Sequence, residues 1–309
     1  MTRLQITRIV ALAAAVSIAA VGCGGSEAES GGPVPPGNTG TATETTGSPV
    51  DTVGTTVSTG RLYRVWFTRG TALGSETAAG QEHLFPGWRE GPETTAVASA
   101  AVSFLLDGPT AAETQADVSS QIPPGTRLLG IDIDGGTATV DLTSEFESGG
   151  GSASMFGRLA QVVYTLTEFE TVKRVRFALD GEPVDVFSGE GIVLDKPVTR
   201  ADYEELLPPI LADSPLFGRR VSSPVHIEGS ANVFEANVTV RLLDANGDEL
   251  VHRFTTATCG TGCRGRFEID LPYQVPVDQA RTIVLSDDDA DGNGSPHFLV
   301  RIPVTLSQG

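Results

Sequence analysis

Residues 128–142 read LLGIDIDGGTATVDL, and this stretch decides the fold of the first half of the chain. Two runs in which apolar and polar residues alternate, 128–133 and 137–142, flank the tripeptide DGG at 134–136. A short glycine-containing connection between two alternating runs is typical of a β-hairpin. The stretch therefore predicts two antiparallel strands that bury one face and expose the other.

The segments around this hairpin extend it to a domain of helices and strands. Strand-like apolar runs occupy 62–67 and 172–179. Residues 93–106 and 152–169 carry apolar side chains at helical spacing, so each segment presents one apolar face. The order β-α-β-β-α-β predicts an α+β domain in which two helices pack on one face of a sheet. We assign residues 61–195 to this domain.

The C-terminal part of the chain predicts strands without helices. Alternating runs occupy 223–231, 238–242, 249–256, 266–271, 281–285 and 298–306. Asn246-Gly247 has the sequence of a tight hairpin turn. Short strands separated by turns are typical of an all-β sandwich. We assign 221–309 to this second domain and the proline-bearing stretch 196–220 to a linker.

The first 22 residues predict a targeting segment. Arg3 and Arg8 form a positive start, and 9–21 is an uninterrupted apolar run. That run is shorter than the ~20 residues that a membrane-spanning helix needs, so 1–22 is predicted to be a signal peptide. It ends in a small residue before Cys23, which resembles the lipobox of bacterial lipoproteins. We expect Cys23 to be lipidated; the alternative is an ordinary secretory signal with a cysteine nearby.

A change of composition follows the predicted anchor. Glycine, serine, threonine and proline dominate residues 23–60. Too few apolar side chains are present to offset the entropy of ordering, so we expect a disordered tether. Its ends would lie about 30–35 Å apart on average. The sequence thus predicts a protein anchored by lipid to the extracytoplasmic face of the cell membrane.

Four motifs of the first domain resemble the GerMN domain of spore-germination and sporulation lipoproteins. They are TVDLTSEF (139–146), Gly151-Ser152, VYTLT (163–167) and VRFALDG (175–181). The resemblance implies a domain that serves protein–protein assembly, and it brings no catalytic residues with it.

Segments of the second domain resemble the immunoglobulin-like domain of bacterial spore germination proteins. These segments are SPV (223–225), VFEANV (233–238), RGRF (264–267) and IPVTL (302–306). In that family the domain often follows a GerMN domain. The resemblance therefore implies an α+β GerMN-like domain followed by an all-β immunoglobulin-like sandwich.

Two cysteines remain besides Cys23, and both stand in TCGTGC at 258–263. An exported compartment permits a disulfide between Cys259 and Cys263, and the two glycines allow so short a loop to close. The alternative is a metal pair with His252, but zinc sites usually have four ligands and the sequence offers no second pair. We expect the disulfide, no metal and no cofactor.

Two other features each allow two interpretations. The acidic stretch 287–291 begins like a calcium loop, but Phe298 stands where the bidentate glutamate belongs, so a solvated loop is favoured. Ser152 follows three glycines and predicts the N-cap of the helix at 152–169. The alternative is an anion-binding nest formed by the glycines and the helix N-terminus.

Charge and motif content limit the possible functions. A formal net charge of −18 repels phosphate backbones, which disfavours nucleic acid as a partner. The 4 histidines do not form H-E-x-x-H, and the sequence contains neither a G-x-S-x-G elbow nor a P-loop. We therefore expect a protein that is not an enzyme.

These observations predict a protein-interaction or scaffolding module of the cell envelope. The GerMN sheet would dock on an envelope protein or on a second copy of the chain, and the β-sandwich would add a second surface. The alternative is a ligand-binding lipoprotein that recognises a cell-wall glycan or peptide through an exposed Trp88 in the loop 83–88. Trp66 is expected in the core or on the sheet surface.

Overall fold

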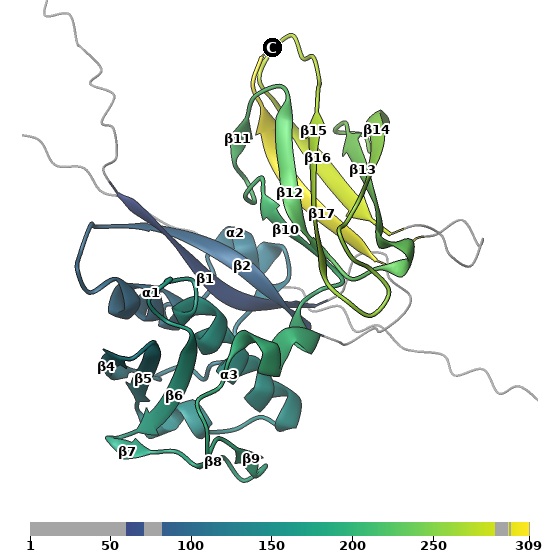
Figure 1. Ribbon diagram of the computed structural model, residues 1–309. Helices are drawn as coiled ribbons and strands as arrows, with labels where there is room; N and C mark the ends of the chain where they lie inside the picture. Colours follow the sequence, from purple (N-terminus) through teal and green to yellow (C-terminus); the bar gives the residue numbers. More distant parts are fainter. Residues whose placement is uncertain (1–59, 71–81, 288–295, 297, 309) are drawn as a thin grey trace, which may run out of the picture. The chain divides into compact units, whose positions relative to one another are not determined.

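The computed structural model describes residues 60–70, 82–287, 296 and 298–308 (Figure 1). The predicted signal peptide, Cys23, the tether and most of the acidic loop 287–291 lie outside these residues. The described elements belong to one compact unit and build two hydrophobic cores, one for each predicted domain. None of the described helices is both long enough and apolar enough to cross a membrane.

The first domain combines short sheets with helices. Its strands are β1 (Arg61–Gly70), β2 (Glu82–Gly91), β3 (Val118–Ser119), β4 (Leu128–Asp134), β5 (Thr137–Leu142), β6 (Arg174–Leu179), β7 (Glu182–Pro183), β8 (Val186–Phe187) and β9 (Ile192–Val193). Its α-helices are α1 (Val97–Leu106), α2 (Ala111–Gln115) and α3 (Ser152–Leu166), and its 3-10 helices are η1 (Ser144–Glu147) and η2 (Arg200–Leu206). The strand orders are β2-β1-β3, β4-β5-β6-β7 and β8-β9.

The hairpin predicted at 128–142 is confirmed as β4 and β5. The two strands are antiparallel, with Ile131 opposite Val140. Gly135 and Gly136 turn the chain with φ values of 53° and 80°, which residues with a Cβ rarely adopt. Helix α3 then connects β5 to the parallel strand β6, as parallel pairing requires. The predicted α+β class is confirmed.

Strand β1 does not join this sheet, contrary to the expectation of one sheet for the whole domain. It pairs with β2 and β3 and packs against α1 and α3. Val65, Trp66 and Phe67 of β1 are almost fully buried, so the expected core position of Trp66 is the one observed. The core of the first domain is therefore built on two separate sheets, β2-β1-β3 and β4-β5-β6-β7.

Strand β2 includes the segment 83–88, for which we expected a loop. It runs antiparallel to β1, with Pro86 opposite Trp66. Proline has no N–H to donate, so it is tolerated in a strand at the edge of a sheet, where β2 lies. A Cβ on Gly87 would lie 2.8 Å from the Phe67 ring, so glycine lets the strands approach. The Pro-Gly pair interrupts the alternation and hides the strand in the sequence.

The backbone of Trp66 is bonded to helix α3 instead of a third strand. Its N–H donates to Oγ1 of Thr165 at 3.0 Å, and its carbonyl accepts from Nε2 of Gln161 at 3.0 Å. Thr165 and Gln161 lie one turn apart on the same face of α3, and both are fully buried. Because an unpaired buried backbone group is costly, these two bonds fix α3 against β1.

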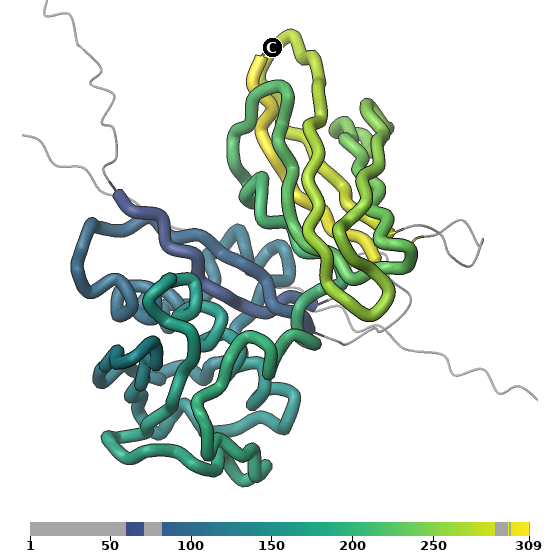
Figure 2. The backbone as a smooth tube through the Cα atoms, viewed as in Figure 1, coloured from purple at the N-terminus to yellow at the C-terminus, as the bar shows by residue number. Residues whose placement is uncertain are grey.

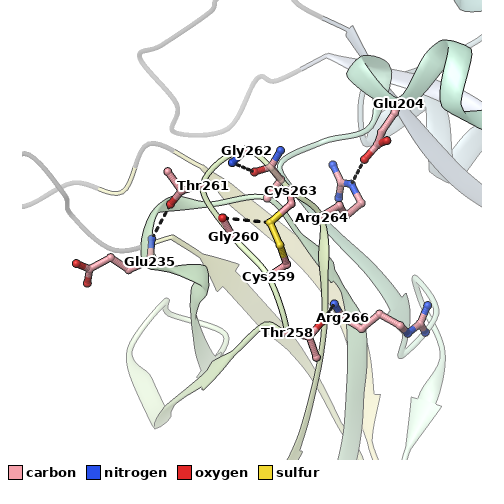
Figure 3. The surroundings of a disulfide bond; sticks show 11 residues. Glu204, Glu235, Thr258, Cys259, Gly260, Thr261, Gly262, Cys263, Arg264 and Arg266 are labelled. Atoms are coloured by element: carbon pink, nitrogen blue, oxygen red, sulfur yellow. Dashed lines mark hydrogen bonds and ion pairs between the residues drawn. A yellow bond between two sulfur atoms is a disulfide. The ribbon is translucent and has the colours of Figure 1, made fainter.

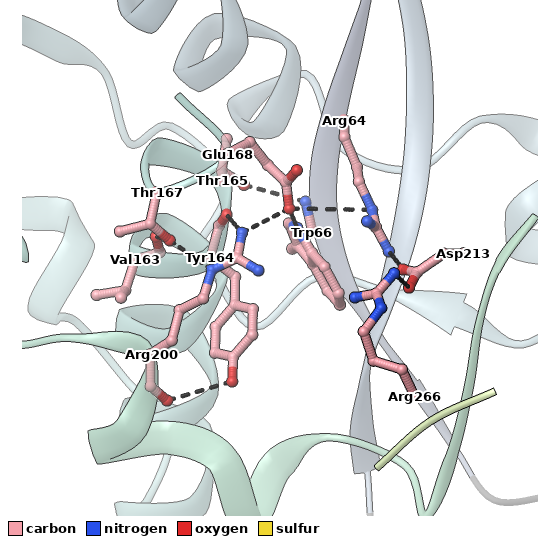
Figure 4. Close-up of polar contacts among 10 residues, drawn as sticks. All are labelled: Arg64, Trp66, Val163, Tyr164, Thr165, Thr167, Glu168, Arg200, Asp213 and Arg266. Carbon is pink, nitrogen blue, oxygen red and sulfur yellow. Dashed lines mark hydrogen bonds and ion pairs between the residues drawn. The ribbon is translucent and has the colours of Figure 1, made fainter. Parts of the chain in front are cut away.

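A cluster of polar side chains extends this contact (Figure 4). Glu168, just after α3, accepts from Nε1 of Trp66 at 2.9 Å and from Arg200 at 2.5 Å. The guanidinium of Arg200 also donates to Oγ1 of Thr167 at 2.7 Å and stacks on the Tyr164 ring, 4.8 Å from its centre. Arg200 is the first residue of η2, so the cluster ties η2 to α3.

The stretch 196–220, which we expected to be a linker, carries ordered elements. Helix η2 packs on α3, and Tyr203 of η2 is buried in the first core. Strands β10 (Ile210–Ser214) and β11 (Arg220–Val221) belong to sheets of the second domain. The prolines of this stretch are typical of linkers, and for that reason the sequence did not predict these elements.

The second domain is the predicted β-sandwich (Figures 1 and 2). Besides β10 and β11, its strands are β12 (Val225–Ala231), β13 (Asn237–Leu243), β14 (Glu249–Thr256), β15 (Gly265–Leu271), β16 (Gln279–Ser286) and β17 (Leu299–Leu306), with one described 3-10 helix, η3 (Phe234–Ala236). The strand orders are β10-β12-β15 and β11-β17-β16-β13-β14. In β13, Val238, Val240 and Leu242 are fully buried and the residues between them are half-buried, as the alternation predicts.

We predict that Gln161→Leu lowers the free energy of unfolding of the first domain by about 2–4 kcal/mol. The substitution leaves two backbone groups without their partner, the buried Trp66 carbonyl and the half-buried Gln121 N–H, and each costs up to about 1–3 kcal/mol. Both tryptophans of the chain lie in the first domain, so urea unfolding followed by tryptophan fluorescence measures this change. The control Gln115→Leu alters an exposed residue of α2 and should shift stability by less than about 0.5 kcal/mol. Equal stability of the two variants would contradict the role of Gln161.

Candidate functional site

The first domain carries an open groove of about 1080 Å³. Strands β1 and β2, the segment after β3, the start of α3 and helix η2 all contribute to its walls. The lining residues are Thr68, Glu82, Leu84, Gln121, Gly151, Ser152, Ala153, Ser154, Phe156, Gly157, Asp202, Tyr203, Glu205 and Leu206. These segments are far apart in the sequence, so no single motif could have predicted the groove.

The charged lining of the groove is acidic. Glu82, Asp202 and Glu205 line it, and no arginine, lysine or histidine occurs among its described lining residues. Nε2 of Gln121 donates to the carboxylate of Glu82 and holds it in place. Asp202 accepts from the N–H of Thr199 at 2.6 Å, whereas Glu205 is exposed and has no hydrogen-bond or ion-pair partner in the described part of the chain. The groove therefore carries a negative potential that favours a cationic group.

An apolar surface lies beside these carboxylates. Phe156 on α3 is 41% exposed although it belongs to the apolar face that the sequence predicts. Its ring meets the buried ring of Tyr203 edge-on, with 6.5 Å between the ring centres. Burial raises the pKa of Tyr203, and the charge of Asp202 adds to the effect, so this phenol stays neutral. The groove thus combines negative charge with an exposed aromatic ring.

The glycine loop before α3 forms one end of the groove. The N-cap residue is Gly151 and not Ser152, so the N-cap prediction is wrong; the Ser152 hydroxyl contacts the carboxylate of Glu190 instead. The buried guanidinium of Arg158 donates to the carbonyl of Gly149 at 3.0 Å and to Oγ of Ser154 at 3.0 Å. It also donates to the carbonyl of Phe146 in η1 and to that of Ser148, just before the glycines. A buried cation therefore holds the loop through its carbonyl groups.

The residues of η2 are the part of the groove that sequence reasoning missed. They fell in the expected linker 196–220. A usable signal was present, because Thr199 and Asp202 form the capping box that starts η2. Thr199 is followed three residues later by an acidic residue, a pattern that marks helix starts.

Trp88, our candidate for an exposed contact, lies in strand β2 and is half-buried. The guanidinium of Arg64 lies 5.7 Å from the centre of its ring. Trp88 is not part of the groove; it lines a separate, smaller hollow together with Phe85 and Pro86 of the same strand. The ring is therefore one wall of a hollow and not an open platform.

Cys259 and Cys263 form a disulfide with their Cα atoms 5.8 Å apart (Figure 3). The loop that they close donates two backbone N–H groups, from Thr261 at 3.0 Å and from Gly262 at 2.9 Å, to the segment 232–233. The disulfide loop lies between β14 and β15, and its partner segment lies after β12. The loop therefore fastens two connections of the sandwich to each other.

The remaining predicted sites give less information. No group of three or more metal-ligating side chains that could hold an ion occurs among the described residues. His252, the third ligand of the alternative metal hypothesis, lies 3.3 Å from Glu249, and the cysteines it would need are in the disulfide. Residues 288–291 of the acidic loop and the predicted lipid site Cys23 lie outside the described residues.

An α+β domain with a β-hairpin and a parallel crossover, followed by an immunoglobulin-like sandwich, defines the class of this protein. Residues 62–185 match the family model Germane, described as sporulation and spore germination, and residues 210–293 match Gmad2, the immunoglobulin-like domain of bacterial spore germination. The chain therefore combines a GerMN domain with a Gmad2 domain, as the motifs predicted. These are germination-related families and not families of known enzymes.

Comparisons with solved structures give matches of low identity. The first GerMN domain of the sporulation protein GerM from Bacillus subtilis matches at 18% identity and a TM-score of 0.38, over 46% of this chain and 99% of that one. The tandem GerMN domains of the same protein match at 13% identity and a TM-score of 0.39, over 81% of this chain and 61% of that one. A putative lipoprotein from Clostridium perfringens matches at 17% identity and a TM-score of 0.33, over 48% and 93%. No curated protein matches in sequence.

We predict that the double variant Cys259→Ser, Cys263→Ser destabilises the second domain by about 2 kcal/mol. The loop is short, so removing the cross-link gives the unfolded chain only this modest gain in entropy. Urea unfolding followed by far-ultraviolet circular dichroism should show the earlier transition. The wild-type protein in dithiothreitol should match the variant. A variant whose transition coincides with that of the oxidised wild type would contradict a stabilising role for the disulfide.

Proposed function

We propose that this chain is a non-catalytic, lipid-anchored protein of the cell envelope that binds a partner protein through the groove of its GerMN domain. One observation carries the proposal. The groove combines three carboxylates with an exposed Phe156, and its described lining contains no cation to neutralise them. Such a surface fits a protein segment that carries both basic and apolar side chains.

The partner segment is basic by charge complementarity. Glu205 is exposed without an ion-pair partner among the described residues, and Glu82 is oriented by Gln121, so both carboxylates are available to an arginine or a lysine. The whole chain carries a net charge of −18, which raises the encounter rate with a basic partner. The same charge repels a second copy, so we favour an envelope protein over self-association.

The groove is a better docking surface than the open face of the sheet β4-β5-β6. That face carries Asp132, Thr139 and Arg176 side by side across three strands. One acidic and one basic side chain there flank a central threonine, so this row carries no net charge. Exposed charges of mixed sign contribute little to binding, whereas the groove presents charge of one sign.

The hydroxyl groups of the groove support binding over catalysis. Ser152 contacts the carboxylate of Glu190, and Ser154 accepts a hydrogen bond from Arg158. An activated serine needs a neighbouring general base that takes its proton. Ser154 faces a cation instead, and the base beside Ser152 is a carboxylate, which is a weak base for a hydroxyl group. The envelope location rests on the lipobox at Cys23 and on the tether composition.

Recognition of a cell-wall glycan or peptide through Trp88 is the alternative hypothesis. A sugar ring needs an accessible aromatic face with hydrogen-bonding groups beside it. Trp88 is half-buried, Arg64 lies near its ring, and Phe85 and Pro86 are its neighbours in the hollow. A half-buried ring among these neighbours is a poor platform for a sugar. We therefore favour the groove as the binding site.

We predict that the groove binds a fluorescein-labelled peptide of twelve residues that contains arginines and phenylalanines, and that it does not bind the same peptide with glutamates in place of the arginines. Glu205→Gln and Glu82→Gln should each weaken binding about 2–5-fold, and added salt should weaken it further. Fluorescence anisotropy measures these affinities. Glu93→Gln, an exposed glutamate outside the groove, is the matched control and should leave the affinity unchanged. Binding that is insensitive to the Glu82→Gln, Glu205→Gln double variant would refute the proposed site.

A further inference from the structure

The hollow beside Trp88 is small and mostly apolar. Its volume is about 100 Å³, and aromatic side chains from both domains of the compact unit line it. Phe85 meets Phe217 edge-on, with 6.0 Å between the ring centres, and Phe298 lies 6.3 Å from the ring of His83. A dry engineered cavity of about 150 Å³ binds benzene, so this hollow has room for a group of about the size of one small ring or a few methylenes.

The charged side chains that line the hollow are all cationic. Arg69 and Arg301 contribute to its wall, and no aspartate or glutamate occurs among its described lining residues. The guanidinium of Arg69 lies over the Phe85 ring, 5.2 Å from its centre. Neither arginine forms an ion pair with a described carboxylate. Burial lowers the pKa of Arg69, and the charge of Asp117 opposes this effect from beyond ion-pair distance.

His83 lines the same hollow, and the contact of its ring with the backbone of Leu206 does not reach the geometry of a hydrogen bond. Its side chain is only 8% exposed, and neither ring nitrogen has a hydrogen-bond partner among the described residues. Burial is the main influence that lowers the pKa of His83; the backbone of Leu206 opposes it and the charge of Arg264 adds to it. The ring is therefore neutral near pH 7 and offers one donor and one acceptor. Buried polar groups are normally hydrogen-bonded, and the Leu206 contact serves at most one of the two ring nitrogens, so at least one nitrogen is available to a ligand.

We propose that this hollow binds a small apolar ligand that carries one anionic group. The apolar part lies among Phe85, Trp88 and Phe217, and the anion lies beside Arg69 and Arg301. His83 donates a hydrogen bond to the ligand. This site is separate from the acidic groove and takes a ligand of opposite charge, so it stands or falls independently of the proposed function.

The charge of the ligand is tested with three molecules of equal shape. 3-Phenylpropanoate is the anionic probe, 3-phenylpropanamide the neutral one and 3-phenylpropylamine the cationic one. Isothermal titration of the folded chain should show saturable binding of the anion, with a dissociation constant below about 1 mM for a ligand of this size. The amide should bind at least fivefold more weakly and the amine not at all. No saturable heat with the anion, or equal binding of all three probes, overturns the proposal.

Variants locate the site. Arg301→Gln should weaken 3-phenylpropanoate at least fivefold and leave the affinity for the amide nearly unchanged. Leu216→Trp should fill the hollow and abolish binding of both. Arg253→Gln changes an exposed arginine of β14 outside the hollow and should have no effect. If Arg301→Gln and Leu216→Trp both bind the anion like the wild type, the ligand lies elsewhere and the proposal is wrong.

The source of the ligand is tested separately. Laurate and vesicles of phosphatidylglycerol present the same chemistry, an apolar chain with an anionic group, as a free acid and as a lipid. Displacement of 3-phenylpropanoate by laurate assigns the hollow to a free acid, and co-sedimentation with vesicles that Arg301→Gln abolishes assigns it to a lipid. Either result supports the site; failure of both probes, together with failure of 3-phenylpropanoate, overturns it.

Discussion

The backbone of Trp66 must be hydrogen-bonded at a point where no strand is available, and much of the first domain follows from this constraint. Strand β3 pairs only with residues 68–69 of β1, so Gln161 and Thr165 of α3 take the place of a strand at Trp66. This fixes α3 against β1. Glu168, at the end of α3, then anchors η2 through Arg200, and η2 completes the groove.

Charge is distributed unevenly over this acidic chain. The groove of the GerMN domain is lined by carboxylates without a described cation, whereas the hollow beside Trp88 is lined by arginines without a described carboxylate. Both arrangements leave charge uncompensated by the described neighbours, and both lie in concave surfaces. Other buried charges have partners within the fold: the Arg89 guanidinium lies 2.8 Å from the Glu113 carboxylate, and Arg158 is bonded to backbone carbonyls. Uncompensated charge therefore distinguishes the two candidate binding surfaces from the structural ion pairs.

Much of the fold was predictable from local patterns, because the hairpin at 128–142, helix α3 and most strands of the sandwich have regular alternation or helical spacing. Strand β2 escaped prediction because Pro86 and Gly87 interrupt its alternation, although an edge strand tolerates both. Helix η2 escaped because prolines surround it. The groove could not be predicted at all: its lining comes from segments between Thr68 and Leu206, and only tertiary contacts such as those of Arg200 bring them together.

The most direct measurement is photocrosslinking in living cells, with a photoreactive amino acid at position 156 or 205 in the groove and, as a control, at position 176 on the open face of the sheet. Mass spectrometry of the adducts identifies what each position touches. A protein-binding groove predicts recurrent crosslinks from 156 and 205 to one envelope protein, with a basic segment at the crosslinked site, and none from 176. Adducts with cell-wall fragments alone, or the same adducts from all three positions, would contradict it.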